Sequence, residues 1–225
     1  MIIAIDGPAG SGKSSTAKMV AQALSILHLD TGAMYRAITL KCLKKGIAFT
    51  DNEAMDRIMR QTSIAFTGTP PDIRVWMDGE DVTGAVRGDE VTKSVSDYCT
   101  VPVVREELVE LQRKIAEGQS VVCEGRDIGT VVFPDADLKF FMVASIEERA
   151  RRRKIDFERM GVKKDMTEIV AEITERDRKD STRRQSPLKK ADDAVEIDTT
   201  RMTIDEQVGF IVDRARALVS RGNAH

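Results

Sequence analysis

The stretch Gly7-Pro8-Ala9-Gly10-Ser11-Gly12-Lys13-Ser14 decides the fold of this 225-residue chain. It fits the pattern G-x-x-x-x-G-K-[ST], in which glycines let several backbone N–H groups face one anion. It lies between the apolar run at residues 2–5 and a helical pattern, the context that a phosphate-binding loop requires. A chance glycine-rich turn is the alternative, and the full eight-residue match argues against it. The loop predicts binding of nucleotide phosphates without saying which reaction follows.

Each part of this loop has an expected contact. The helix that follows points its positive dipole end at the phosphates. Lys13 is expected to place its ammonium on the β- and γ-phosphates of ATP, and the Ser14 hydroxyl to bind Mg²⁺. The residues predicted to bind ATP are Gly7, Pro8, Ala9, Gly10, Ser11, Gly12, Lys13, Ser14 and Ser15.

The sequence around the loop predicts a βαβ unit. Residues 2–5 and 26–29 are short apolar runs typical of buried strands. Between them, Ala17, Val20 and Ala21 recur at the spacing of one helix face. A strand, a helix and a second strand in this order imply a parallel sheet covered by helices, and so an α/β fold. Further strands are predicted at 121–123, 138–143 and 195–198, a charged helical segment at 146–184, and a closing amphipathic helix from residue 204.

Residues 63–82 change in character and predict a small antiparallel insertion. Ile73, Val75 and Met77 alternate with polar or amphipathic neighbours, and Asp78-Gly79 is a strong hairpin signal. We expect this insertion to be separate from the main sheet.

Composition narrows the function classes. Apolar residues make up 41% of the chain and charged residues 32%, with a net charge of −2, which argues against a general binder of nucleic-acid polymers or membranes. The three cysteines are far apart, which argues against a zinc site or redox pair and fits a reducing cytoplasm. Residues 2–5 are too short for a signal segment, and no apolar stretch approaches a membrane span. The only histidines are His28 and His225, so histidine-based catalysis is not expected.

Polar residues at two strand ends suggest where a second substrate would bind. Asp30 follows the second strand, and we expect it beside the phosphate loop, holding Mg²⁺ through water. Its alternative is a helix N-cap, and the alternative for Arg36 is a solvated charge. At the other strand end, Arg126 could clamp a phosphate and Asp127 could accept from an amino group of a base.

The charged segment contains two further patterns. Ile169, Ile173, Arg176, Asp180 and Arg183 fall on one helical stripe that turns from apolar to charged, as expected for a helix entering a polar site. A surface ladder of ion pairs is the alternative. The basic run Arg149, Arg151, Arg152 and Arg153 predicts either a solvated helix face or a mobile lid that brings arginines to the transferring phosphoryl group.

Together these motifs resemble bacterial cytidylate kinase over nearly the whole chain. The most specific stretch is Glu124-Gly125-Arg126-Asp127-Ile128-Gly129-Thr130-Val131-Val132-Phe133-Pro134-Asp135-Ala136, supported by the phosphate loop and by Leu29-Asp30-Thr31-Gly32-Ala33-Met34-Tyr35-Arg36. Position 31 is often serine and position 124 often aspartate in that family. The resemblance implies a P-loop core at 1–30, 101–148 and 185–225, a nucleoside monophosphate-binding domain at 31–100, and a lid at 149–184.

The resemblance also implies roles by position. Arg36, Arg126 and Arg176 match the arginines that hold the acceptor phosphate, and Lys13, Arg126 and Arg176 are the expected catalytic residues. Tyr35 and Asp180 match contacts around the sugar. The expected CMP-binding residues are Thr31, Tyr35, Arg36, Ser96, Arg105, Arg126, Asp127, Arg176, Asp180 and Arg183, of which Ser96, Arg105, Asp127 and Arg183 match the group that reads cytosine.

The expected reaction is transfer of the γ-phosphoryl group of ATP, with Mg²⁺, to CMP or dCMP, by a cytoplasmic monomer. A kinase for another nucleoside monophosphate such as UMP is the nearest alternative. A non-catalytic P-loop switch is another, although the N-K-x-D motif of guanine-binding switches is absent from the sequence.

Overall fold

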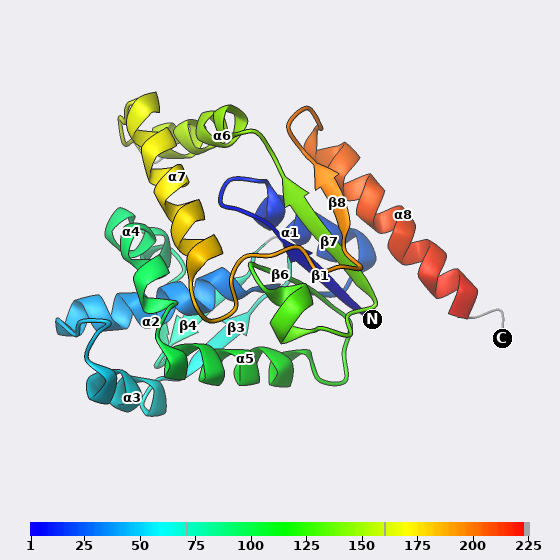
Figure 1. Cartoon of the computed structure of the whole chain (residues 1–225). Coiled ribbons are helices and arrows are strands. Elements are labelled where there is room, and N and C mark those ends of the chain that lie inside the picture. The colour runs from blue at the N-terminus through cyan, green and yellow to red at the C-terminus, as the bar shows by residue number, and fades with distance from the viewer. Residues whose placement is uncertain (71, 160, 223–225) are drawn as a thin grey trace.

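The computed structural model describes residues 1–70, 72–159 and 161–222, and its centre is a five-stranded parallel sheet (Figure 1). The strand order is β2-β6-β1-β7-β8. The strands are β1 Ile2–Asp6, β2 Leu27–Asp30, β6 Val121–Gly125, β7 Leu138–Val143 and β8 Val195–Asp198. All five predicted strands are therefore confirmed, and β2 and β6 run one and two residues further toward their carboxyl ends than predicted.

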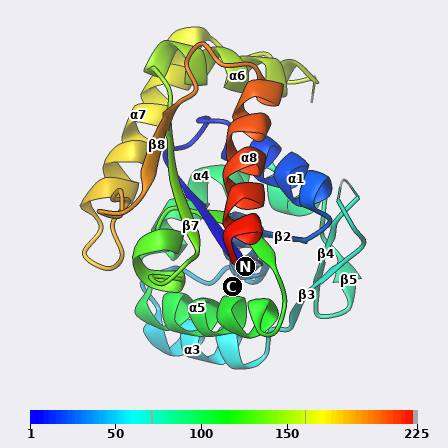
Figure 2. The same ribbon diagram turned by 90° about the vertical axis from the view of Figure 1, so that its right-hand side faces the viewer.

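Two helices cover one face of this sheet. They are α1 Lys13–Leu24 and α8 Ile204–Gly222, which lie side by side in Figure 2. Ile3, Ile5 and Val122 point from the strands into this layer, where they meet the predicted apolar face of α1. The closing helix is confirmed.

The opposite face carries most of the remaining helices. These are α2 Thr31–Lys45, α3 Asn52–Arg60, α4 Asp89–Tyr98 and α5 Pro102–Ala116, with a single 3₁₀ turn at Ala85–Arg87. One apolar cluster runs from Ala4 and Cys123 of the sheet through Met34 and Ile38 of α2 to Met55 of α3. The segment 31–100 therefore shares its core with the sheet.

The predicted insertion is a three-stranded antiparallel sheet of order β3-β4-β5, formed by Ile64–Thr67, Arg74–Met77 and Glu80–Asp81. Its β4–β5 turn has φ values of 53° at Asp78 and 84° at Gly79. Positive φ at both central residues is the conformation that an Asp-Gly hairpin favours, which confirms the prediction made from this pair.

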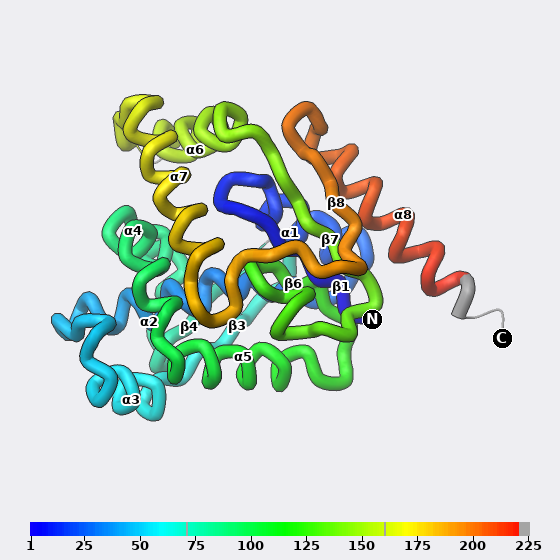
Figure 3. Tube along the Cα trace, in the orientation of Figure 1, coloured from blue at the N-terminus to red at the C-terminus, as the bar shows by residue number. Residues whose placement is uncertain are grey.

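The charged segment forms two helices that stand beyond the carboxyl ends of the parallel strands. They are α6 Ile146–Arg159 and α7 Met166–Thr182 (Figure 1). Ala150 and Phe157 of α6 pack against Ile169 and Ile173 of α7 in a separate small cluster. Figure 3 follows the chain from the end of α7 back to β8. The pair is thus tied to the sheet mainly through its two connections and its polar contacts.

The phosphate loop is fitted tightly against β7. At Gly7, φ is 147°, and a Cβ atom added there would lie 2.1 Å from the backbone oxygen of Met142. Only glycine allows this approach without moving the strand.

We expect Gly7→Ala to destabilise the protein by about 3 kcal/mol, because the new methyl group overlaps a backbone atom that cannot rotate away. The matched control is Gly209→Ala in α8, where a Cβ meets nothing within 4 Å. That change should stabilise the protein by about 0.5–1 kcal/mol through helix propensity. Urea denaturation of both variants measures the difference; equal midpoints would contradict the packing argument.

Candidate active site

The loop between β1 and α1 has the geometry of an anion cradle. Gly10 and Gly12 have φ values of 78° and 97°, and α1 begins at Lys13. The Lys13 ammonium donates to the Pro8 carbonyl oxygen at 2.9 Å, so the lysine side chain curls back over its own loop. Burial and then the positive charge of Arg126 lower the pKa of Lys13 to about 7. The loop is therefore short of negative charge, which phosphates would supply.

The carboxylate that meets the Ser14 hydroxyl is Glu124, at the end of β6. Ser14 Oγ donates to Glu124 Oε2 at 2.7 Å. Glu124 is only 3% exposed, and its Oε1 has no hydrogen-bond partner among the described residues. The carboxylate accepts the hydroxyl hydrogen, which leaves a lone pair of the Ser14 oxygen for Mg²⁺, a metal that prefers oxygen ligands. These two residues therefore fit the metal that the sequence predicts.

Asp30 ends β2, and β6 separates that strand from β1, which leads into the phosphate loop. In the β2–β6 register Asp30 lies beside Glu124, whose carboxylate accepts from Ser14. The Oδ1 of Asp30 accepts from the Ala33 backbone N–H at 2.9 Å, which makes Asp30 the N-cap of α2, and Arg36 pairs with it at 3.0 Å. The contact of Asp30 to Mg²⁺ through water stays a prediction.

A buried charge cluster surrounds Asp127. Arg105 and Arg183 both pair with this carboxylate, Arg183 at 3.5 Å. The Arg105 guanidinium also lies 5.5 Å from the centre of the Tyr35 ring, and burial raises the pKa of the Tyr35 hydroxyl. Ser96, on α4, is buried as well. The structure thus gathers Arg105, Asp127, Arg183 and Tyr35 from four distant segments, as the resemblance implies.

A second cluster holds two arginines, of which one is paired with a carboxylate. Arg126 donates to Asp180 at 2.8 Å. Burial and the charge of Arg126 lower the pKa of Arg176 to about 10, and Arg176 Nε has no hydrogen-bond partner among the described residues. The stripe on α7 therefore faces inward, and the surface-ladder alternative is wrong for it. An exposed pair, Glu175–Arg178, forms such a ladder on another face of the helix.

Thr31 and Asp6 hold the backbone of the segments that carry these clusters. The Thr31 hydroxyl donates to the backbone oxygen of Glu124 at 2.7 Å, which secures the end of β6. Asp6 accepts from the backbone N–H groups of Ile128 at 2.9 Å and Gly129 at 2.7 Å. It thereby fixes the single helical turn Ile128–Val132 that follows Asp127, while burial raises the pKa of Asp6 to about 6. Asp6 was not predicted from the sequence, although its position directly after the predicted strand 2–5 could have marked it as a site residue.

The basic run on α6 divides into inward and outward members. Arg149 donates to the Ala9 carbonyl oxygen at 3.2 Å and to Asp177 at 2.6 Å, so it links the phosphate loop to α7. Arg152 donates to the Thr199 carbonyl oxygen at 2.6 Å. By contrast, Arg151 pairs with Glu148 near solvent, and Arg153 lies over the Phe157 ring.

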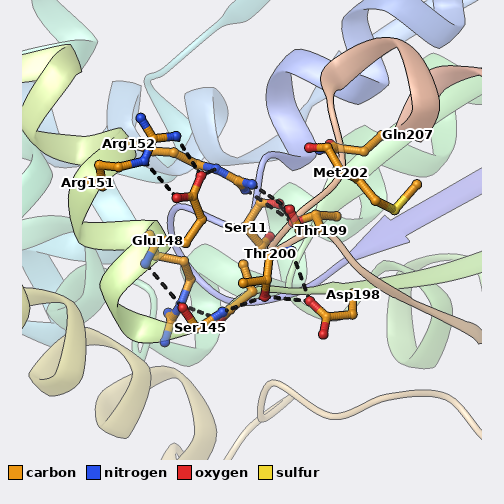
Figure 4. A network of polar contacts seen from close by, with 12 residues as sticks. Ser11, Ser145, Glu148, Arg151, Arg152, Asp198, Thr199, Thr200, Met202 and Gln207 are labelled. Carbon is orange, nitrogen blue, oxygen red and sulfur yellow. Dashed lines mark hydrogen bonds and ion pairs between the residues drawn. The ribbon is translucent and has the colours of Figure 1, made fainter.

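Thr199 joins this part of the lid to the phosphate loop. Figure 4 shows it between Arg152 and Ser11. Its hydroxyl donates to the Ser11 carbonyl oxygen at 2.8 Å and accepts from Arg152 at 3.1 Å. Nearby, Gln207 accepts from the Thr16 hydroxyl at 2.8 Å. Neither Thr199 nor Gln207 was predicted from the sequence, because these residues lie some 190 residues from Ser11 and Thr16 respectively.

Comparison with known proteins agrees with this geometry. The sequence model of a family described as cytidylate kinase matches residues 3–217. The chain belongs to the cytidylate kinase family. A cytidylate kinase from Pelotomaculum thermopropionicum is 50% identical over 216 residues and covers 96% of both chains. One from Geobacillus thermodenitrificans is 48% identical over 211 residues and covers 94% of both.

Solved structures support the fold alone. A gluconokinase from Sinorhizobium meliloti matches with a TM-score of 0.52 at 14% identity, covering 99% of this chain and 97% of its own. The cytidylate kinase family and the observed parallel sheet therefore agree on a P-loop kinase architecture with an added antiparallel sheet.

The low pKa of Lys13 gives a test of the phosphate loop in this cytidylate kinase family member. At pH 8 a lysine with a pKa of about 7 is mostly neutral, and a bound phosphate raises that pKa again. Binding of ADP should therefore take up close to one proton at pH 8, and affinity should fall as the pH rises above 7. Calorimetry in buffers of different ionisation enthalpy measures the uptake.

The control for this measurement is Lys13→Ala, which should lose the uptake. Equal proton uptake by the variant and the parent protein would contradict the role given to Lys13.

Proposed function

We infer that this protein is a cytidylate kinase, which transfers the γ-phosphoryl group of ATP to CMP or dCMP and releases ADP with CDP or dCDP. The observation that carries the inference is Asp127, buried between Arg105 and Arg183, in a chain of the cytidylate kinase family. Nothing observed favours a kinase for another acceptor or a switch without catalysis.

The pairing of Asp127 with Arg105 suits the edge of cytosine. Cytosine offers an amino group as donor and ring N3 and O2 as acceptors. Asp127 accepts from the amino group, and Arg105 donates to the ring acceptors. Uracil presents a carbonyl and an N3–H at the same places, so it faces a carboxylate with a lone pair. A buried polar group left unpaired costs about 1–3 kcal/mol, which corresponds to a preference for CMP of roughly tenfold or more.

The arginines Arg36, Arg126 and Arg176 would hold the phosphate of the acceptor. In the structure, Asp30 pairs with Arg36 and Asp180 pairs with Arg126. Among the described residues, Arg176 has no carboxylate within ion-pair distance. We propose that the acceptor phosphate enters beside Arg176 and draws the other two arginines from their carboxylates. Asp180, once released, would be free to contact the sugar hydroxyls, the role that the resemblance implies for it.

Catalysis needs alignment and positive charge rather than a strong base. The attacking oxygen belongs to a phosphate that is already ionised near neutral pH. Lys13 and the arginines neutralise the charge that builds up on the transferred group, and the contact of Arg149 with Ala9 supports a similar role for this lid residue. Magnesium bound with ATP would add charge neutralisation, with Ser14 as a protein contact and Glu124 accepting the Ser14 hydrogen. Closure of α6 and α7 would exclude water, whose attack would waste ATP.

The proposal includes a domain division, an oligomeric state and a location in the cell. The division into a core at 1–30, 101–148 and 185–225, a monophosphate-binding domain at 31–100 and a lid at 149–184 fits the position of the two sheets. A monomeric state and a cytoplasmic location are kept as predictions. Within the described residues, no helix combines the length and apolar character needed to span a membrane.

The decisive experiment offers CMP, dCMP, UMP, AMP, GMP and dTMP separately with Mg-ATP and measures ADP release, with a blank that contains no acceptor. We expect strong release with CMP and dCMP and roughly tenfold less or lower with UMP. Turnover with a different acceptor would keep a kinase but remove the base-reading assignment. Release that ignores every acceptor would overturn the proposed function.

Asp127→Asn tests how the base is chosen. The amide keeps the shape of the carboxylate but can donate to the uracil carbonyl, so the ratio of kcat/KM for CMP to that for UMP should fall about tenfold. Asp177→Asn is the matched control, since Asp177 pairs with the lid residue Arg149 and lies outside the cytosine-reading group. It should change both rates by the same factor. An unchanged ratio in Asp127→Asn would exclude Asp127 from base selection.

A further inference from the structure

Glu124 has a second neighbour that the proposed reaction leaves unexplained. His28 Nε2 lies 3.4 Å from Glu124 Oε1, the oxygen that Ser14 does not use. His28 is 7% exposed, and neither of these two atoms has a hydrogen-bond partner among the described residues. A buried ring nitrogen and a buried carboxylate oxygen therefore face each other with no other group to satisfy them.

The sheet fixes this encounter. In the β2–β6 register His28 lies beside Val122, and Glu124 lies beside Asp30. Side chains two residues apart in a strand share a face, so His28 and Glu124 point to the same side. Val122 packs under α1 on that side, and α1 carries Ser14 in its first turn. The contacts from His28 to Glu124 and from Glu124 to Ser14 thus connect β2, β6 and the first turn of α1, the helix that follows the phosphate loop.

A glutamate at this position needs a support that an aspartate would not need. It has one more rotatable bond than the aspartate often found here in the family, so more conformations must be suppressed to hold its carboxylate still. Ser14 contacts one oxygen only. A contact at the other oxygen removes rotation about the last bond, and His28 is placed to make it.

The orientation of Glu124 matters for the metal because of the Ser14 hydroxyl. A hydroxyl can give a lone pair to Mg²⁺ only when its hydrogen points elsewhere, and Glu124 Oε2 receives that hydrogen. Groups that orient a metal ligand in this way change metal affinity strongly when they are removed.

We propose that His28 is a positioning residue for the magnesium–nucleotide complex. His28 Nε2 lies 3.4 Å from Glu124 Oε1, and in the nucleotide-bound protein its N–H donates to that oxygen and holds Glu124 in the orientation in which Oε2 accepts from Ser14. The proposal rests on the proposed function, because it takes Mg-ATP as the bound nucleotide. The competing explanation is that His28 only fills space in the core beneath α1.

The test measures binding and does not depend on turnover. His28→Phe keeps a ring of similar size without the donor, and His28→Gln keeps a donor at about the position of Nε2. The dissociation constant of ADP is measured by calorimetry with excess Mg²⁺ and again with EDTA. In His28→Phe the affinity gained from Mg²⁺ should fall about tenfold, while ADP binding in EDTA stays unchanged. In His28→Gln most of the gain should return.

Glu124→Asp provides a second comparison. Its shorter carboxylate withdraws from His28, so adding His28→Phe to Glu124→Asp should have no further effect on the gain from Mg²⁺. If His28→Phe does not fold, as judged by circular dichroism, His28→Leu takes its place as the variant without a donor.

Two results would overturn the proposal. One is equal weakening of ADP binding with Mg²⁺ and with EDTA, which would indicate a packing role. The other is an unchanged gain from Mg²⁺ in the variants without a donor. The proposed function would fail differently, through the absence of acceptor-dependent ADP release by the unaltered protein.

Discussion

The burial of several cations close to one another is the constraint on which the site depends. Lys13, Arg126 and Arg176 come from three segments of the chain, and each lowers the pKa of a neighbour or has its own lowered. Holding such charges away from water is unfavourable unless anions approach them. The sheet supplies the rigid frame, since the β1–β6 pairing fixes two of these segments relative to each other. The phosphate groups of two substrates are the anions that this arrangement lacks.

While no substrate is bound, carboxylates of the protein itself pair with the arginines of the site. Asp30 pairs with Arg36, Asp180 with Arg126, and Asp177 with Arg149. These pairs are largely buried, so the attraction between the two charges offsets the cost of removing them from water and keeps each arginine ordered. Substrate phosphates carry more charge than a carboxylate and can displace it. The same pairs therefore stabilise the protein alone and leave the arginines available for binding.

The sequence allowed the fold to be predicted further than the site. Strands such as 195–198 and the Asp78-Gly79 hairpin depend on short patterns, and the phosphate loop is a local motif with a fixed context. The neighbours of Asp30 depend on the strand order β2-β6-β1, which no local pattern contains, so the sequence could suggest its N-cap role but not its place beside Glu124. The partners of Asp6 and Glu124 were also out of reach, because they lie more than one hundred residues away. The residues expected around cytosine came from the resemblance to a family, because the spacing of charges alone left them open.

The contacts of Thr199 and Gln207 have a consequence for the order in which the site is assembled. The phosphate loop is encoded within the first fifteen residues, yet Ser11 is held by Thr199 and Thr16 by Gln207. A partial chain that ends before β8 lacks both contacts, however well its first strand is paired. During synthesis on the ribosome, the phosphate loop therefore emerges well before the residues that complete it. Nucleotide can stabilise the finished loop only after β8 and the first turn of α8 have been made.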